Sequence, residues 1–267
     1  MRTLPPRILT IAGSDSSGGA GIQADLKTIT ALGGFGMSAV TALTAQNTVG
    51  VSGIHEVPAE FVGLQIDAVV NDIGVDAAKT GMLASTPVIL VVADRVRRYR
   101  IERLVVDPVI VAKSGARLLE AQAERSLCRE LLPLALVVTP NLSEAAVLSG
   151  LKVTGLEQMR EAARHISGMG PRWVLVKGGH LSGPPVDLLF DGREFTEVER
   201  PRIQTKDTHG TGCTYASAIA TFLGGGVSVS ESVRLARDAV QRALEHALPL
   251  GHGQGPLDHR RLFEPDP

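Results

Sequence analysis

Short apolar stretches alternate with longer amphipathic stretches along most of the chain. The short stretches predict β-strands at 8–11, 38–43, 75–79, 104–106, 136–138 and 173–176. The amphipathic stretches predict helices at 23–32, 61–70, 88–98, 121–131 and 156–169, with further helices beginning at Ser143 and after Cys213 and a long one at 227–248. Two strand-like segments, 187–190 and 194–198, flank Asp191-Gly192 and predict a β-hairpin.

This order of elements predicts an α/β fold. Strands that alternate with helices form a mainly parallel sheet with helices on both faces, and the hairpin adds an antiparallel edge. No repeat, linker or low-complexity stretch divides the 267 residues. We therefore expect one domain that spans residues 1–267.

Polar or glycine-rich groups follow almost every predicted strand. They are Gly13-Ser14-Asp15, Thr44-Ala45-Gln46-Asn47, Lys79-Thr80-Gly81, Asp107-Pro108, Thr139-Pro140-Asn141 and Lys177-Gly178-Gly179. In open α/β sheets, ligands bind beyond the carboxyl ends of the strands. The recurrence of polar groups there predicts one shared ligand site.

The segment Thr205–Cys213 ends in Gly210-Thr211-Gly212-Cys213, directly before a small-residue helix. A glycine turn at a helix N-terminus presents free N–H groups and the positive end of the helix dipole, which favours an anion such as a transferring phosphoryl group. The alternative is a plain helix start with packing glycines. Cys213 is either an inert buried thiol or a proton acceptor whose pKa the helix end lowers.

Candidate metal and phosphate ligands lie at three other strand ends. Asp107 and Glu144 carry the hard carboxylates that suit Mg²⁺, which proteins bind mostly through waters. Glu144 is equally compatible with a first-turn acid that interacts with its helix dipole. Lys177 either contacts a phosphate or is a solvated lysine. The amide of Gln46 offers a donor and an acceptor side by side, which complements an aminopyrimidine edge, although such a glutamine is also a common loop hydrogen bonder.

Composition excludes several classes of function. The net charge of −1 and the 3% aromatic content argue against a nucleic-acid partner. Two cysteines make no disulfide framework, no signal peptide precedes the first strand, and no apolar run approaches the ~20 residues of a membrane span, so we expect a cytoplasmic protein. The chain has neither a G-x-G-x-x-G fingerprint after its first strand, nor a P-loop, nor a Cys/His cluster for zinc.

Eight motifs, taken together, resemble the hydroxymethylpyrimidine/phosphomethylpyrimidine kinases of the ribokinase-like superfamily. They lie at 11–27, 41–48, 79–83, 106–109 with 112–115, 139–145, 176–180, 209–214 and 251–256, and so cover almost the whole chain. The resemblance implies a ribokinase-like three-layer α/β/α sandwich. It also implies that ATP and Mg²⁺ are used to phosphorylate 4-amino-5-hydroxymethyl-2-methylpyrimidine and then its monophosphate, for thiamine biosynthesis.

The resemblance also assigns roles by position. Gln46 matches the residue that recognises the pyrimidine, Asp25 an acid that lines its pocket, and Gly13, Met82 and Val109 further parts of the substrate site. Asp107 and Glu144 match the Mg²⁺ neighbourhood, and Lys177, Asn141, Thr208, Thr211 and Gly212 the ATP site. Gly210, Thr211 and Gly212 match the anion hole, with Lys177 beside it, and Cys213 stands where related kinases have an aspartate base.

Two other functions are compatible with these motifs. Pyridoxal kinases share the fold, and a non-catalytic relative that senses the pyrimidine would belong to a different class of protein. Intact Asp107, Lys177 and glycine turn argue against the second. Asp207 replaces a frequent asparagine beside the phosphate site, where its charge would weaken nucleotide binding unless it faced solvent. A homodimer is expected from the resemblance alone.

Overall fold

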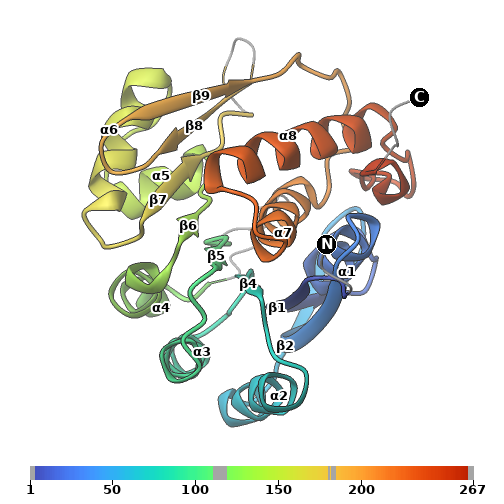
Figure 1. The fold of residues 1–267 in the computed structure, drawn as a ribbon. Helices are drawn as coiled ribbons and strands as arrows, with labels where there is room; N and C mark the ends of the chain where they lie inside the picture. Colours follow the sequence, from blue (N-terminus) through green and yellow to red (C-terminus); the bar gives the residue numbers. More distant parts are fainter. Residues whose placement is uncertain (1–3, 111–118, 180, 182–184, 264–267) are drawn as a thin grey trace.

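One nine-stranded sheet, in the order β3-β2-β1-β4-β5-β6-β7-β8-β9, runs through the part of the chain that the structure describes (Figure 1). The structure is a computed structural model and describes residues 4–110, 119–179, 181 and 185–263. Its strands are β1 (Arg7–Asp15), β2 (Phe35–Gln46), β3 (Val51–Glu56), β4 (Ala77–Thr80), β5 (Leu104–Val106), β6 (Val137–Val138), β7 (Trp173–Val176), β8 (Val186–Phe190) and β9 (Phe195–Glu199).

The sheet is parallel at its centre and antiparallel at both edges. The pairs from β2 across β1, β4, β5 and β6 to β7 are parallel, whereas β8 and β9 form the predicted hairpin beside β7. The second antiparallel edge, β3 against β2, was missed by the sequence analysis. Five of the six residues of β3 are exposed, so the segment shows no alternation of apolar and polar positions. The mainly parallel α/β fold is confirmed.

Helices cover both faces of this sheet and make it the middle of three layers. They are α1 (Gly21–Ala31), α2 (Ala59–Asp72), α3 (Thr86–Arg98), α4 (Ala121–Ser126), α5 (Leu142–Ser149), α6 (Leu156–Ser167), α7 (Thr211–Gly224) and α8 (Val229–Glu245). Helices α2 to α6 enclose one apolar core, with Ile11 and Val92 among its members, and α1, α7 and α8 enclose the other, around Ile8 and Ile219 (Figure 1).

Helix α7 is buried along most of its length between the sheet and α8. Its small residues, such as Ala216, Ala218 and Ala220, are fully buried and allow the helix to approach the strands closely. The helix contacts β1, β4 and β5, and Gly212 in its first turn lies next to Asp107, which follows β5, so the N-terminus of the helix lies near the carboxyl ends of the central strands. The fold thereby directs the glycine turn of the sequence analysis toward the predicted ligand site.

Most predicted helix boundaries differ from the structure by one or two residues, and the largest differences lie at 121–131 and 227–248. The helix expected at 121–131 is α-helical only to Ser126 and continues as a π-helical turn, η1 (Leu127–Leu131), which leads into a 3₁₀ turn, η2 (Leu132–Leu134). The last long helix covers 229–245, shorter at both ends than expected. A further 3₁₀ turn, η3 (His259–Arg261), follows it. Within the described residues, no helix combines the length and apolarity needed to span a membrane.

Candidate active site

A cavity of about 490 Å³ lies at the carboxyl ends of the central strands, against the N-terminus of α7. Twelve of the fourteen predicted site residues line it: Gly13, Gln46, Met82, Asp107, Val109, Asn141, Glu144, Lys177, Gly210, Thr211, Gly212 and Cys213. The other two, Asp25 and Thr208, are not in its wall. Residues from Ala12 to Gln254 in sequence therefore meet in one site, as the rule for strand ends predicts.

The turn at the start of α7 can be built only with glycine at position 210. Gly210 has a left-handed φ of 82°, and a Cβ atom there would lie 1.8 Å from the carbonyl oxygen of Gly19. Gly212 faces the charged residues of the site, because a Cβ atom there would lie 3.3 Å from Lys177 Nζ and 3.7 Å from Asp107 Oδ2. The first turn of α7 thus adjoins a lysine, an arrangement that suits an anion.

Lys177 and Asp107 form an ion pair at the cavity wall. Lys177 Nζ lies 2.8 Å from Asp107 Oδ1, which also accepts a hydrogen bond of 3.0 Å from the Thr139 hydroxyl. Burial opposes ionisation of Asp107, but the attraction of Lys177 and Lys79 outweighs it and keeps the pKa of this carboxyl below its ordinary value. Asp107 is therefore a fixed negative charge next to the glycine turn.

Glu144 has a structural role in addition to its place in the cavity wall. It forms a capping box with Asn141 at the start of α5: Glu144 N–H donates to Asn141 Oδ1 at 3.0 Å, and Asn141 N–H donates to Glu144 Oε2 at 2.8 Å. Burial raises the pKa of Glu144 to about 7, since neighbouring Lys177 lowers it less and Asp107 raises it further. A cation beside these two carboxylates would favour the ionised form of Glu144.

Of the two alternatives for Cys213, the lowered pKa is wrong. Burial raises the pKa of this thiol to about 11; Lys79 attracts the thiolate, but Asp25 and Asp107 repel it. The backbone N–H of Gly21 donates a hydrogen bond toward the sulfur and offsets only part of this rise. The thiol is therefore protonated at neutral pH, even though it lies in the first turn of α7.

Asp25 lies beneath the cavity and does not line it, so its predicted place in the pocket wall is corrected. Its carboxylate is fully buried and binds Lys79 Nζ at 3.0 and 2.9 Å. It also accepts hydrogen bonds of 2.6 Å from the hydroxyls of Thr10 and Ser217. Lys79 itself is fully buried and lies at the cavity wall. In the sequence, Lys79 is a charged residue at the end of a predicted apolar strand, and no role was predicted for it.

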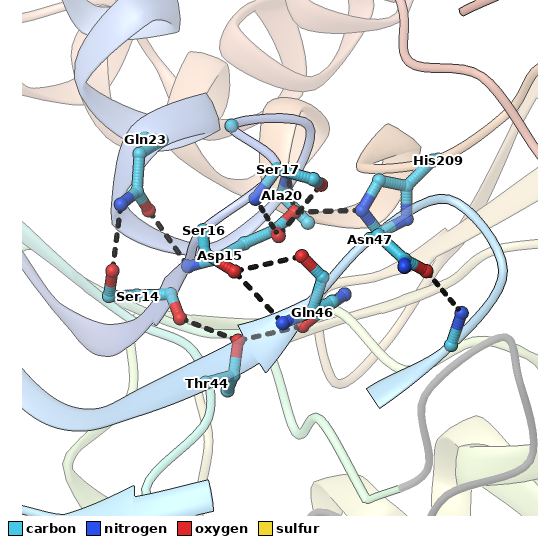
Figure 2. Close-up of polar contacts among 12 residues, drawn as sticks. Ser14, Asp15, Ser16, Ser17, Ala20, Gln23, Thr44, Gln46, Asn47 and His209 are labelled. Atoms are coloured by element: carbon cyan, nitrogen blue, oxygen red, sulfur yellow. Dashed lines mark hydrogen bonds and ion pairs between the residues drawn. The ribbon is translucent and has the colours of Figure 1, made fainter. Parts of the chain in front are cut away.

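Gln46 is held by a group of hydroxyls from the β1–α1 loop and the end of β2 (Figure 2). Its backbone N–H donates to Ser16 Oγ at 2.9 Å, and the same hydroxyl donates to the Gln46 carbonyl at 2.8 Å. The Thr44 hydroxyl lies 3.1 Å from Gln46 Oε1 and 2.9 Å from the Ser14 carbonyl oxygen. The amide of Gln46 is therefore positioned by its neighbours before any ligand binds.

A hydrogen bond that the sequence analysis missed joins the two glycine-rich loops. His209 Nε2 lies 2.8 Å from Asp15 Oδ2 (Figure 2). A Cβ atom at Gly19 would lie 2.4 Å from the His209 ring, so this glycine allows the close approach. His209 and His252 both line the cavity. His180, the last residue of the motif at 176–180, and the motif segment at 112–115 fall outside the described residues.

Two residues expected near the nucleotide do not line the cavity. Asp207 is buried and accepts a hydrogen bond of 2.8 Å from Gly255 N–H, so it neither lines the cavity nor faces solvent. Thr208 contributes its carbonyl oxygen, which accepts from the Thr211 hydroxyl at 2.7 Å. Asp207 thus holds the backbone near Gly255, and Thr208 holds the Thr211 side chain of the glycine turn.

Comparison with known proteins identifies the family. The family model "Phosphomethylpyrimidine kinase" matches residues 15–258. The chain belongs to this family. It is 52% identical to the hydroxymethylpyrimidine/phosphomethylpyrimidine kinase of Streptomyces coelicolor over 96% of this chain and 94% of that protein. It is also 54% identical to the thiamine biosynthesis bifunctional protein ThiED of Geobacter sulfurreducens, over 94% of this chain; the match spans about half, 52%, of that longer relative.

A solved structure confirms the fold class. The pyridoxal kinase of Bacillus subtilis, in complex with ADP, superposes with a TM-score of 0.90 and 36% identity over 97% of this chain and 98% of that chain. The ribokinase-like fold expected from the motifs is thus confirmed, as is the kinase family. Since a pyridoxal kinase shares the fold this closely, backbone shape alone does not separate the two substrate classes.

Proposed function

We propose that this phosphomethylpyrimidine kinase transfers the terminal phosphoryl group of ATP to 4-amino-5-hydroxymethyl-2-methylpyrimidine, and then phosphorylates the resulting monophosphate for thiamine synthesis. One observation carries this proposal: a single cavity holds the amide of Gln46 at one wall and the glycine turn at 210–212 at another. The amide suits an aminopyrimidine edge, and the turn suits the charge that develops on a transferring phosphoryl group.

In this proposal the chain's own residues mainly position and stabilise charge, as phosphoryl transfer requires. Gly210, Thr211 and Gly212 would present backbone N–H groups to the phosphoryl oxygens, and Lys177 would contact them from the strand end. Asn141 and Thr211 complete the ATP site. Gly13, Met82 and Val109 would pack against the pyrimidine, with Gly13 close enough to Met82 that a Cβ atom there would lie 3.1 Å from the sulfur.

Mg²⁺ belongs to the same proposal. Among the described residues, no three His, Cys, Asp or Glu side chains form a metal cage. Two buried carboxylates at one wall, Asp107 and Glu144, with the pKa of Glu144 raised to about 7, suit instead a cation that is held mainly by phosphates and waters. Such an ion would neutralise charge on the phosphates, while Asp107 and Glu144 would orient its water ligands.

A coupled assay for ADP release tests the function. We expect ATP-dependent turnover of the hydroxymethylpyrimidine and of its monophosphate, and much weaker turnover of pyridoxal. Replacing Lys177 by methionine should lower kcat by about 10²–10³-fold, because a donor to the developing charge is lost. A preference for pyridoxal would establish the alternative vitamin B6 kinase, and binding of the pyrimidine without turnover would establish a sensor.

We also propose a cytoplasmic homodimer built from a single domain. The outer edge of the sheet exposes large apolar side chains: Leu43 on β2, Ile54 on β3, and Phe61 and Leu64 on α2. Exposed apolar residues concentrated on neighbouring elements are typical of an interface. Sedimentation should give a dimer for the native chain and a monomer for Leu43→Asp combined with Phe61→Asp. A native monomer at micromolar concentration would contradict the proposal.

A further inference from the structure

The hydroxyl of Thr44 lies between two groups at the pyrimidine end of the cavity. It is 2.9 Å from the carbonyl oxygen of Ser14 and 3.1 Å from Oε1 of Gln46 (Figure 2). Thr44 is 9% exposed at the end of β2 and lines the cavity. How the single hydrogen of its hydroxyl is shared therefore decides which end of the Gln46 amide faces the ligand.

Counting donors shows that the two contacts conflict if Oε1 faces Thr44. A hydroxyl has one hydrogen, whereas the Ser14 carbonyl and the Gln46 Oε1 can only accept. One of the two oxygen–oxygen contacts would then lack a hydrogen. The 2.9 Å contact to Ser14 is the shorter, and its carbonyl belongs to the backbone and cannot turn.

A half-turn of the amide removes the conflict. It exchanges Oε1 and Nε2 without moving any other atom, since the two ends of an amide have nearly the same shape. The Thr44 hydroxyl then donates to Ser14 and accepts from Gln46 Nε2, so both contacts become hydrogen bonds. Among the described residues, no hydrogen bond holds Nε2 at its cavity side, so the half-turn breaks none.

We propose that Thr44 is a positioning residue that fixes the Gln46 amide with Nε2 toward Thr44 and Oε1 toward the cavity. The backbone of Gln46 is already clamped by the Ser16 hydroxyl, through contacts of 2.8 and 2.9 Å, so the amide end is the part left to be oriented. The second N–H and the oxygen of the Gln46 side-chain amide then form one edge, on which the order of donor and acceptor is fixed. That edge accepts a hydrogen bond at its outer end and donates one nearer Thr44.

This inference rests on the proposed function and makes its ligand more specific. A ring that binds this edge must present a donor outside and an acceptor next to Thr44. A 4-aminopyrimidine does so with its exocyclic amine and adjacent ring nitrogen. The 4-oxo analogue presents the opposite pattern, a carbonyl oxygen outside and a ring N–H inside. Unmatched polar groups then remain buried, and the site rejects the analogue.

The experiment measures kcat/KM, or the inhibition constant where turnover is undetectable, for 4-amino-5-hydroxymethyl-2-methylpyrimidine and its 4-oxo analogue. We expect the native enzyme to prefer the amine by about 100-fold or more. Thr44→Val removes the hydroxyl at similar volume and should reduce this preference about tenfold, with the KM for ATP unchanged. Thr44→Ser keeps the hydroxyl, and its preference for the amine should stay within about twofold of the native value. Gln46→Ala should abolish it.

A preference that is unchanged in Thr44→Val would overturn the proposal, as would a loss that Thr44→Ser does not restore. A second measurement does not depend on the variants folding or on the substrate. Neutron diffraction from a deuterated crystal should show two deuterium atoms on the Gln46 amide atom nearest the Thr44 hydroxyl, and deuterium atoms bonded instead to the other amide atom would refute the orientation. If the native enzyme phosphorylates neither pyrimidine, the proposed function fails, and the neutron result still decides the amide.

Discussion

Lys79→Met should lower the free energy of unfolding by about 3–5 kcal/mol, since it leaves a buried charge without its partner. Lys79 and Asp25 are both fully buried and in contact at 2.9 Å. The hydroxyls of Thr10 and Ser217 would remain as partners of Asp25, but neither carries a positive charge. Unfolding in urea, followed by circular dichroism, measures the loss.

A surface ion pair provides the matched control. Arg97 and Glu130 lie 2.9 Å apart with 48% and 38% of their side chains exposed, so Arg97→Met should cost at most about 1 kcal/mol. The double variant Lys79→Met with Asp25→Leu removes both buried charges and should recover much of the stability. A loss for Lys79→Met as small as that for Arg97→Met would contradict the account of the buried pair.

The order of the helices and strands was predictable, because each of these elements depends on the local spacing of apolar and polar residues. The strand ends were also predictable as a site, since parallel strands bring their carboxyl ends to the same edge. That is how Gln46 and Lys177, 131 positions apart in the printed sequence, could be placed in one cavity. The exposed strand β3 was not predictable, because its pairing depends on β2 and its own residues carry no alternating pattern.

Properties that depend on burial could not be obtained from the sequence. The position of Cys213 at a helix start suggested a lowered pKa as one of two alternatives, but burial of the thiol raises the pKa instead. Asp25 was expected to line the pyrimidine pocket, and only the structure shows that its carboxylate binds Lys79 Nζ. In both cases the missing quantity was which side chains surround the group, and this is a property of tertiary packing.

Cys213→Ala should slow the first phosphorylation far more than the second if the thiol acts as a base, with the loss in the first step growing toward about 10²–10⁴-fold as the pH approaches 11 and the thiolate forms. In the first step an alcohol must lose its proton during attack, whereas in the second the nucleophile is a phosphate oxygen that is already ionised. The thiol lies at the start of α7, beside the glycine turn that would hold the phosphoryl group. Single-turnover rates with the alcohol and with its monophosphate separate the two steps.

The pKa of Cys213 gives this prediction a second, independent readout. Because the base form is the thiolate and the pKa is about 11, kcat/KM for the alcohol should rise with pH, by up to tenfold per unit, throughout the range below 11 in which the enzyme stays folded. In Cys213→Ala this rise should disappear. The matched control is Cys128→Ala, which removes a half-buried thiol outside the cavity wall and should leave both rates unchanged. Equal losses in the two steps, with the pH dependence retained, would instead make Cys213 a packing or positioning residue.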